Sequence, residues 1–272
     1  MRSKVLLLAT AGIAVTGFTV IVPAPTTEPA GMKAPMLAMA TPAAELTTML
    51  GATAEADARA SNPRDDLVDE ALDRLSRHVK RQSHPQALRK AFHAYYSYKL
   101  QNPGKVTKPY LYYVDFGLDG RTPRGYVFDM EKMRLVEGPF TVAHGSGSST
   151  SKYAAPSRFS NRPGSKMTSL GLYRAQETYT FRGKSGGRAY TSVGMRMAGV
   201  SGRFNNKARS RGIVAHGAPY VTSSGAGRSE GCPAMEQSRA RRLLPMIANG
   251  GMVFHFSPND GDWLRNDPWV NA

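Results

Sequence analysis

The chain has 272 residues, enough for one large domain or two small ones with a hydrophobic core. Hydrophobic residues make up 41% and charged residues 21%, so most of the chain is expected to fold, and a bare zinc finger is excluded. Its one cysteine excludes a disulfide scaffold, and 36 Lys and Arg against 20 Asp and Glu give a net charge of +16, which favours anionic surroundings.

The N-terminal segment has the order of a secretory signal. Arg2 and Lys4 precede the uncharged run 5–22, and a stretch rich in Pro, Ala and Thr follows. An uncleaved anchor is the alternative, because this run approaches the ~20 apolar residues that span a bilayer. We interpret 1–40 as a signal peptide or N-terminal anchor and 41–61 as a flexible tether with little to bury. Both interpretations place the protein outside the cytoplasm, in the periplasm or cell envelope.

A helical hairpin is predicted over residues 62–103. Asn62 is a helix N-cap, and apolar residues recur at helical spacing as far as Val79. Ser83 and Gln86 fit a capping box at the start of a second helix. Two successive amphipathic helices joined by a short connection are expected to pack against each other.

Short β-favouring runs separated by Gly, Pro, Asn and Asp predict a mainly β domain over residues 104–272. The predicted strands are 110–116, 125–128, 140–143, 169–173, 178–181, 212–215 and 252–256. One further helix is predicted to start just after Cys232 and to run to about Ile247. The expected fold class is therefore mainly β with flanking helices.

Cys232 is the candidate nucleophile. It lies in a polar, Gly-containing turn before the predicted helix, whose exposed N–H groups would stabilise a thiolate and lower the pKa of the thiol. An unpaired cysteine in an exported protein is prone to oxidation unless its reactivity is used. The alternative is that Cys232 is a small buried hydrophobic residue.

A thiol nucleophile needs a base, and His216 is the first candidate. It ends the apolar run 213–215 and precedes Gly217, which places it at a strand end. His144 has a similar setting and is the second candidate, whereas His255 lies inside a predicted strand and is expected to be a strand residue.

Basic residues crowd the approach to Cys232 and could hold the carboxylates of an acidic substrate. They are Arg196, Arg203, Lys207, Arg209, Arg211 and Arg228. Tyr153 and Phe159 are candidates for a lid over the site.

Three short segments near Cys232 resemble the active-site motif of murein L,D-transpeptidases, the YkuD-like catalytic domain. They are Val214–Ala218, Gly227–Ser229 and Gly231–Ala234. The resemblance extends over about residues 110–256.

The runs 159–165, 169–173 and 204–209 are similar to the second YkuD-type branch of this family. Two positions depart from the pattern, because many relatives carry a histidine where this chain has Glu230 and an Asn or Arg where it has Ala234. These departures leave Cys232 and His216 in place.

The resemblance implies a YkuD-like L,D-transpeptidase β-sandwich that needs no cofactor and no metal. Cys232 would attack the carbonyl between the diamino acid and the D-alanine of a peptidoglycan tetrapeptide stem, and D-alanine would leave as a thioester forms. His216 would activate the thiol, the Gly217 carbonyl would orient its ring, and the N–H groups of Gly231 and Cys232 would stabilise the oxyanion. An amine acceptor would give a 3-3 cross-link, and water would give L,D-carboxypeptidase activity.

Peptidoglycan stem peptides are the expected partner, and nucleic acid is not. Substrate contacts are expected from Arg228, Ser229, His144, Asn161 and Arg209. The N-terminal segment could tether the protein to a membrane, and the oligomeric state stays open.

Three other enzyme classes fit the sequence less well. The G-x-S-x-G match at Ser229 favours an α/β-hydrolase, but no apolar strand precedes it and no Asp lies between Ser229 and His255. A zinc hydrolase using His144, His216 and Cys232 lacks a short-range ligand pair. The turn around Cys232 does not resemble that of a sortase.

A non-catalytic wall-binding module is the remaining alternative. Glu230 is the argument for it, because a carboxylate near Cys232 raises the pKa of the thiol. Slow alkylation of Cys232 at neutral pH would favour such a module.

Overall fold

The computed structural model describes residues 62–271. Its helices are α2 (Pro63–Leu75), η1 (Ser76–His78), α3 (Ala87–Gln101), η2 (Ser146–Ser148), η3 (Gly202–Phe204), α4 (Gln237–Ile247) and α5 (Gly261–Asn266). The longer strands are β1 (Tyr110–Asp115), β2 (Gly125–Asp129), β3 (Arg134–Phe140), β5 (Gly171–Ser185), β6 (Arg188–Gly199), β7 (Val214–Gly217) and β12 (Met252–Phe256). Five strands have only two residues each: β4 (His144–Gly145), β8 (Val221–Thr222), β9 (Gly225–Ala226), β10 (Arg228–Ser229) and β11 (Ala234–Met235).

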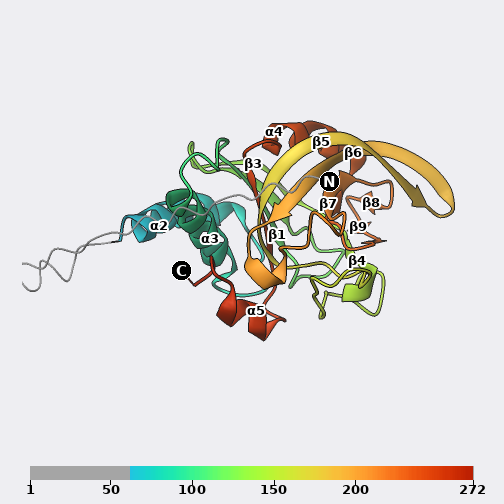
Figure 1. The fold of residues 1–272 in the computed structure, drawn as a ribbon, viewed down its shortest axis with the longest axis horizontal. Helices are drawn as coiled ribbons and strands as arrows, with labels where there is room; N and C mark the ends of the chain where they lie inside the picture. The colour runs from blue at the N-terminus through green and yellow to red at the C-terminus, as the bar shows by residue number, and fades with distance from the viewer. Residues whose placement is uncertain (1–61, 272) are drawn as a thin grey trace, which may run out of the picture. The chain divides into compact units, whose positions relative to one another are not determined.

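Eight of these strands form one mixed sheet. The strand order is β11-β7-β6-β5-β12-β1-β2-β3, and two further pairs, β10 with β4 and β8 with β9, form two-stranded sheets. The mainly β fold with flanking helices is confirmed. Figure 1 shows β5 and β6 as a long arched hairpin that reaches past the short strands β7, β8 and β9.

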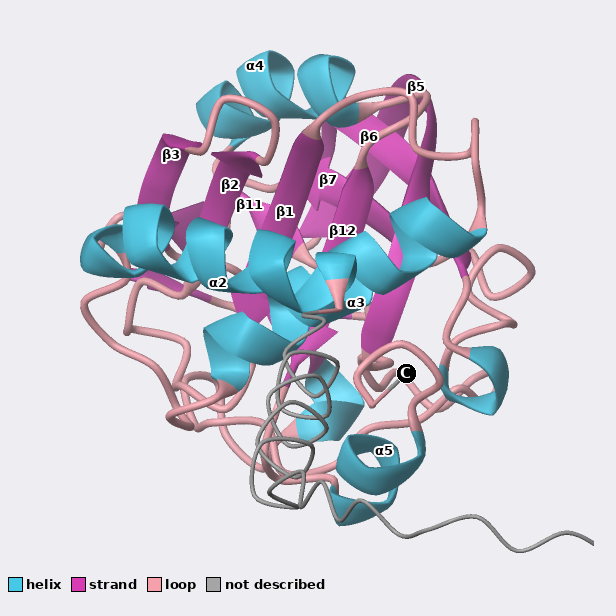
Figure 2. Ribbon diagram, turned by 90° about the vertical axis from the view of Figure 1, so that its left-hand side faces the viewer, coloured by secondary structure: helices cyan, strands magenta, loops and turns pink. Residues whose placement is uncertain are grey.

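The sheet is covered on both faces, because the side chains of β1 alternate between two cores. Leu111 and Tyr113 join the core under α2 and α3, whereas Tyr112 and Val114 join the core under α4. Figure 2 shows α2 and α3 crossing one face of the sheet, with α4 beyond its upper edge. The hairpin formed by α2 and α3 therefore shares its core with the sheet.

The predicted start of the first helix is correct and that of the second is wrong. The Asn62 side chain accepts a hydrogen bond from the Arg64 N–H, as an N-cap does. Ser83 does not cap α3, which begins at Ala87. Its N–H at 2.8 Å and its hydroxyl at 2.5 Å both donate to the buried carboxylate of Asp115 at the end of β1. A long-range partner thus replaces the local capping box.

The β5–β6 hairpin replaces the two separate strands predicted at 169–173 and 178–181. Its turn is Gly186–Gly187, with φ of +55° and +78°, values that favour glycine in a two-residue hairpin turn. β12 pairs with β5 only up to Arg174, and β7 pairs with β6 only at residues 194–196. Within residues 62–271, the outer part of the hairpin therefore has strand pairing only between β5 and β6.

Two predicted elements near the candidate site differ from the structure. The strand predicted at 140–143 is absent, and β3 ends at Phe140. The helix predicted just after Cys232 begins only at Gln237, because Ala234 and Met235 pair with β7 as β11. The predicted signal or anchor and the predicted tether lie outside the described residues, and among residues 62–271 no helix is both long and apolar enough to cross a membrane.

Replacing Ser83 with alanine is expected to destabilise the protein. The change removes a hydroxyl that donates to the carboxylate of Asp115, and a lost hydrogen bond to a buried charged group costs about 1–3 kcal/mol. Urea unfolding of Ser83→Ala measures this loss. Ser238→Ala, an exposed serine on α4, is the matched control and should keep the wild-type free energy of unfolding. Equal stability of the two variants would contradict the assignment.

Candidate functional site

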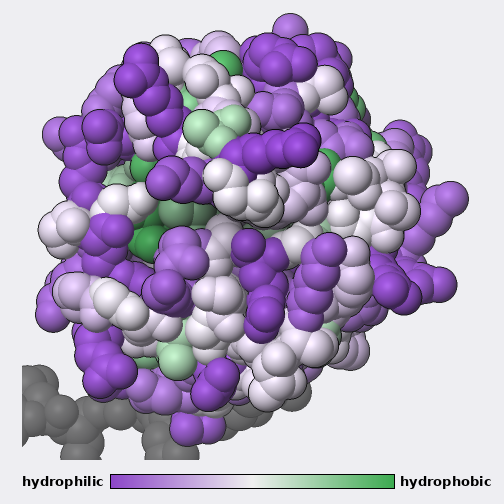
Figure 3. All heavy atoms as spheres, turned by 90° about the vertical axis from the view of Figure 1, so that its right-hand side faces the viewer, coloured by the Kyte–Doolittle hydropathy of each residue, from purple (hydrophilic) through white to green (hydrophobic). Residues whose placement is uncertain are grey.

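One cavity of about 290 Å³ is lined by both the candidate nucleophile and the candidate base. The segments of Cys232 and His216 lie side by side because β7 runs parallel to β11. The His216 N–H also donates to the carbonyl of Pro233, at 3.2 Å. Figure 3 shows the side of the molecule to which the β5–β6 hairpin extends, a mostly hydrophilic surface with a small recessed apolar area.

The imidazole of His216 is held in one orientation. Its Nδ1 lies 3.1 Å from the Gly217 carbonyl oxygen, the contact that the family resemblance implies. Because a carbonyl can only accept, Nδ1 carries the proton and Nε2 keeps its lone pair. The residue is 2% exposed, and burial lowers its pKa to about 4. His216 is therefore neutral at pH 7 and has one nitrogen that can take up a proton.

The thiol of Cys232 is partly enclosed and protonated at neutral pH. Burial raises its pKa to about 11, opposed by a hydrogen bond from the Val214 backbone and by the charge of Arg211, while Glu230 raises it further. The expected lowering of this pKa by a helix N-terminus is wrong. The reason is that Cys232 is not at the start of a helix. The strand β11 follows it in the chain, and α4 begins only at Gln237.

The turn before Cys232 is held by Ser229. The Ser229 hydroxyl donates to the Cys232 carbonyl at 2.7 Å and accepts from the Gly231 N–H at 3.2 Å. Gly231 has a φ of +124°, and a Cβ there would meet the Met167 carbonyl oxygen at 3.0 Å. Of the two expected oxyanion donors, the Gly231 N–H is thus occupied, and the Cys232 N–H has no acceptor among residues 62–271.

A loop around residues 160–167 is joined to this turn by Lys166 and to the segment before β7 by Arg211. Arg211 donates to the carbonyls of Ser160 and Met167, at 2.8 Å each. Lys166 pairs with Glu230 at 2.8 Å. The carboxylate that the sequence placed beside the thiol therefore has its own counterion.

His144 lies beside the site and does not line the cavity. It is fully buried, and Arg124 donates to its Nδ1 at 2.8 Å. Since Nδ1 accepts, Nε2 carries the proton and donates to the Ser149 hydroxyl at 2.7 Å. Burial and the charges of Arg124 and Arg228 lower the pKa of His144 to about 3. Both ring nitrogens are engaged within the protein.

Arg228 is the one residue of the predicted basic group that lines the cavity. It stands on β10, where it pairs with His144 of β4, and its Nη1 donates to the Ser149 carbonyl at 3.2 Å. Among residues 62–271 it has no carboxylate partner.

Other members of that group are already matched by carboxylates on the surface. Arg196 and Arg209 both pair with Glu177, and Arg203 pairs with Asp262. These three arginines are therefore engaged in ion pairs, and none of them lines the cavity of Cys232.

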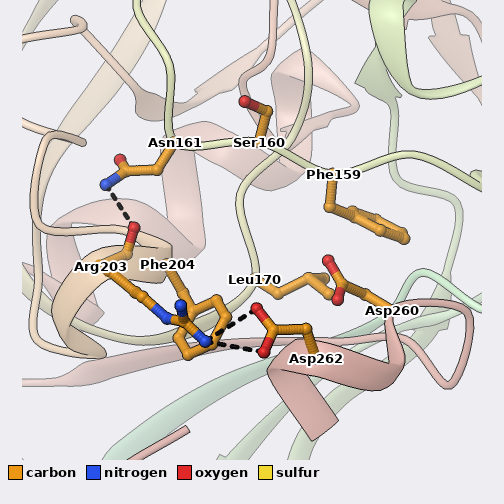
Figure 4. A pocket seen from close by; sticks show the side chains of 8 residues that line it. All are labelled: Phe159, Ser160, Asn161, Leu170, Arg203, Phe204, Asp260 and Asp262. Atoms are coloured by element: carbon orange, nitrogen blue, oxygen red, sulfur yellow. Dashed lines mark hydrogen bonds and ion pairs between the residues drawn. The ribbon is translucent and has the colours of Figure 1, made fainter. Parts of the chain in front are cut away.

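Asn161 lines a different hollow, of about 240 Å³. Its amide nitrogen donates to the Arg203 carbonyl at 2.8 Å, and Figure 4 shows this hydrogen bond above the Arg203–Asp262 ion pair. Phe159 lines the same hollow. Neither it nor Tyr153, the other lid candidate, lines the cavity of Cys232.

The aromatic wall of the cavity was not among the site residues predicted from the sequence. Phe181 and Tyr190 come from facing strands of the β5–β6 hairpin, and Tyr220 comes from the turn before β8. Their signal in the sequence is the Gly186–Gly187 pair between two β-favouring runs, which is typical of a hairpin.

Of His144, His216 and Cys232, the residues of the zinc hydrolase alternative, only His216 and Cys232 line the same cavity. Among residues 62–271, no group of three or more His, Cys, Asp or Glu side chains lies close enough to hold a metal ion.

Comparison with known proteins identifies a family. The sequence model of the L,D-transpeptidase catalytic domain, the second YkuD branch, matches residues 79–256, more than half of the chain. No curated protein gives a significant match.

Solved structures of low identity align with the chain. An L,D-transpeptidase from Mycobacterium smegmatis is 13% identical, with 55% of this chain and 59% of that chain covered and a TM-score of 0.35. An L,D-transpeptidase from Stackebrandtia nassauensis is 15% identical, with 69% and 77% covered and a TM-score of 0.35. L,D-transpeptidase 3 from Mycobacterium tuberculosis is 12% identical, with 55% and 62% covered and a TM-score of 0.34. The aligned part thus spans less than two thirds of the M. smegmatis protein.

The stability of the protein is expected to fall as the pH drops from 6.5 towards 4. Burial lowers the pKa of His144, His216 and His255 to between about 3 and about 4, so the unfolded chain takes up protons in this range that the folded chain does not. Each histidine contributes up to about 1.4 kcal/mol per pH unit. Urea unfolding across this range measures the slope, and His255→Gln should make it shallower. A free energy of unfolding that stays constant would contradict the assignment.

Alkylation of Cys232 by iodoacetamide is expected to be slow at neutral pH and to accelerate towards the thiol pKa of about 11, because the thiolate is the reacting form. Glu230→Gln removes a charge that raises this pKa and should accelerate alkylation at a fixed pH by roughly two- to fourfold. Glu131→Gln, an exposed carboxylate in the turn after β2, is the matched control. A rate that does not change with pH would contradict the raised pKa.

Proposed function

This chain belongs to the family of L,D-transpeptidase catalytic domains, and on that premise we propose that it is a peptidoglycan acyltransferase with Cys232 as nucleophile and His216 as base. The observation that carries the proposal is the shared cavity, into which a neutral imidazole and a single thiol both open. The contact of Nδ1 with the Gly217 carbonyl leaves Nε2 as the basic nitrogen.

In the first step, Sγ of Cys232 attacks the carbonyl carbon between the diamino acid and D-alanine, and Nε2 of His216 takes the thiol proton. The Cys232 N–H is the donor available to the oxyanion. Collapse of the intermediate breaks the C–N bond, His216 returns the proton to the leaving amine, and D-alanine departs from the thioester.

In the second step, the amine of another stem attacks the thioester and His216 takes its proton. The thiolate leaves and is protonated again, which yields a 3-3 cross-link and regenerates the free protein. The same steps with water as acceptor yield a tripeptide, the product of an L,D-carboxypeptidase.

Proton transfer has to accompany the attack. Burial raises the pKa of Cys232 to about 11 and lowers that of His216 to about 4, so a thiolate–imidazolium pair is unfavourable in the unliganded cavity. A base placed next to the thiol can take the proton as the S–C bond forms, without a stable ion pair beforehand.

Arg228 is the cation best placed to bind a stem-peptide carboxylate, because it lines the cavity and has no acidic partner among residues 62–271. Ser229 would act on substrate through the turn that carries Cys232, because its hydroxyl bonds the Cys232 carbonyl. His144 would act through β10, the strand that carries Arg228 and pairs with β4. Asn161 and Arg209 would reach only parts of a substrate that extend beyond the cavity. An envelope location with an N-terminal membrane tether belongs to the same proposal.

A non-catalytic wall-binding module is the second candidate, and the raised pKa of Cys232 is the observation that favours it. A thiol with a raised pKa should be alkylated slowly whether or not it is catalytic, so alkylation does not separate the two candidates. Acyl transfer itself has to be measured.

We expect the full chain to release D-alanine from a purified disaccharide-tetrapeptide and to form a thioester adduct seen by intact-protein mass spectrometry. Cys232→Ala should form no adduct, and His216→Gln should lose about 10²–10⁴-fold in rate, as general-base removal does. Ser238→Ala, on the exposed side of α4, should retain the wild-type rate.

The products then distinguish the outcomes. Cross-linked dimers would assign transpeptidation, and tripeptide alone would assign carboxypeptidase activity. If wild type and Cys232→Ala both leave the tetrapeptide intact and both bind whole sacculi, the protein is a wall-binding module.

A further inference from the structure

The imidazole of His216 is stacked on an aromatic ring from another element. The Phe181 ring on β5 lies with its centroid 4.0 Å from that of His216, at an interplanar angle of 15°. Both residues line the cavity of Cys232. This is the shortest ring contact among residues 62–271, and it joins the outer part of the β5–β6 hairpin to β7.

Two glycines make this contact possible. Gly194 of β6 lies opposite Tyr179 on one side and opposite His216 on the other. A Cβ at Gly194 would meet the Tyr179 ring at 2.9 Å and the Phe181 Cβ at 3.1 Å. One at Gly183 would meet the Tyr190 ring at 2.7 Å and the Phe181 ring at 2.8 Å. The missing side chains leave the space through which Phe181 reaches across β6 to the imidazole.

We propose that Phe181 is a positioning residue, which fixes the ring plane of His216 and excludes water from one face of the imidazole. The proposal rests on the proposed function, because His216 is taken as the base. Two contacts then define the base: Nδ1 is held by the Gly217 carbonyl in the plane of the ring, and Phe181 covers the ring from its face.

Desolvation is the main cause of the lowered pKa of His216, and the Gly217 hydrogen bond acts in the opposite direction. The other ionisable groups that share the cavity are Lys184, Tyr190, Tyr220, Arg228, Glu230 and Cys232. None of them contributes to the pKa of His216 as strongly as its burial does. Removing the stacked ring lets water reach the imidazole, and its pKa should rise towards the ordinary value of 6.5.

The test is an NMR titration of the His216 imidazole combined with steady-state kinetics on the disaccharide-tetrapeptide. Phe181→Leu should raise the pKa of His216 by at least one unit, lower kcat by about 10- to 100-fold through misplacement of the base, and change KM little. The acidic limb of the kcat profile should move to higher pH with it. His216→Gln assigns the NMR signal.

Phe181→Tyr is the conservative variant that keeps the ring, and it should keep the lowered pKa of His216. Arg182→Gln, an exposed change at the next position of β5, is the matched control and should leave both the pKa and kcat unchanged. Phe181→Met, which fills the space without a ring, replaces Phe181→Leu if circular dichroism shows that the latter does not fold.

Failure of the positioning role and failure of the proposed function give different results. If Phe181→Leu and Phe181→Met keep the wild-type pKa of His216 and the wild-type kcat, the positioning role is overturned while the acyltransferase assignment stands. If the wild type releases no D-alanine, the proposed function fails, and a shifted His216 pKa in Phe181→Leu would still support the contact.

Discussion

The site depends on the short parallel pairing of β7 with β11. This pairing sets His216 opposite Ala234, two positions after the thiol, and the Pro233 carbonyl receives the His216 N–H. Backbone hydrogen bonds, and not contacts between side chains, therefore bring the base and the nucleophile to one cavity. The position of β7 is fixed in turn by β6, which pairs with the edge of β7 opposite β11. A displacement of either strand would separate two residues that are 16 positions apart in the chain.

Burial of the two reacting groups is the second constraint. It raises the pKa of Cys232 and lowers the pKa of His216. It disfavours the thiolate of Cys232 and the imidazolium of His216 at once, so neither charge is stable before substrate enters. The nearby charges do not reverse this balance: Lys166 compensates Glu230, and Arg211 is engaged with backbone carbonyls. A thiol and an imidazole that are both neutral before attack favour charge that develops only during attack, where the Cys232 N–H can receive it.

Sequence patterns correctly predicted the features that depend on residues close together in the chain. Asn62 caps its helix, the mainly β character is correct, and Cys232, His216 and Arg228 line one cavity. The failures have a common cause, which is a partner far away in the chain. Ser83 bonds Asp115 instead of capping α3, and residues 234–235 join β7 instead of starting a helix. Asn161 and Arg209, which stay predicted substrate contacts, also have partners far away in the chain, Arg203 and Glu177. Spacing along the chain does not report such pairings.

The aromatic residues that line the cavity show why its shape could not be predicted from the motif around Cys232 and His216. The residues of the motif supply one side, from β7 to β11. Phe181 and Tyr190 come from the outer part of the β5–β6 hairpin, where residues 188–193 of β6 have no strand partner besides β5 in the described part of the chain. Side-chain contacts take the place of strand pairing there: Phe181 stacks on His216, and Tyr190 meets Tyr220 edge to face, with centroids 6.4 Å apart. The hairpin is thus attached to the site through the residues that line it. Because the same contacts hold the hairpin and enclose the base, the shape of the cavity and the environment of His216 cannot change independently.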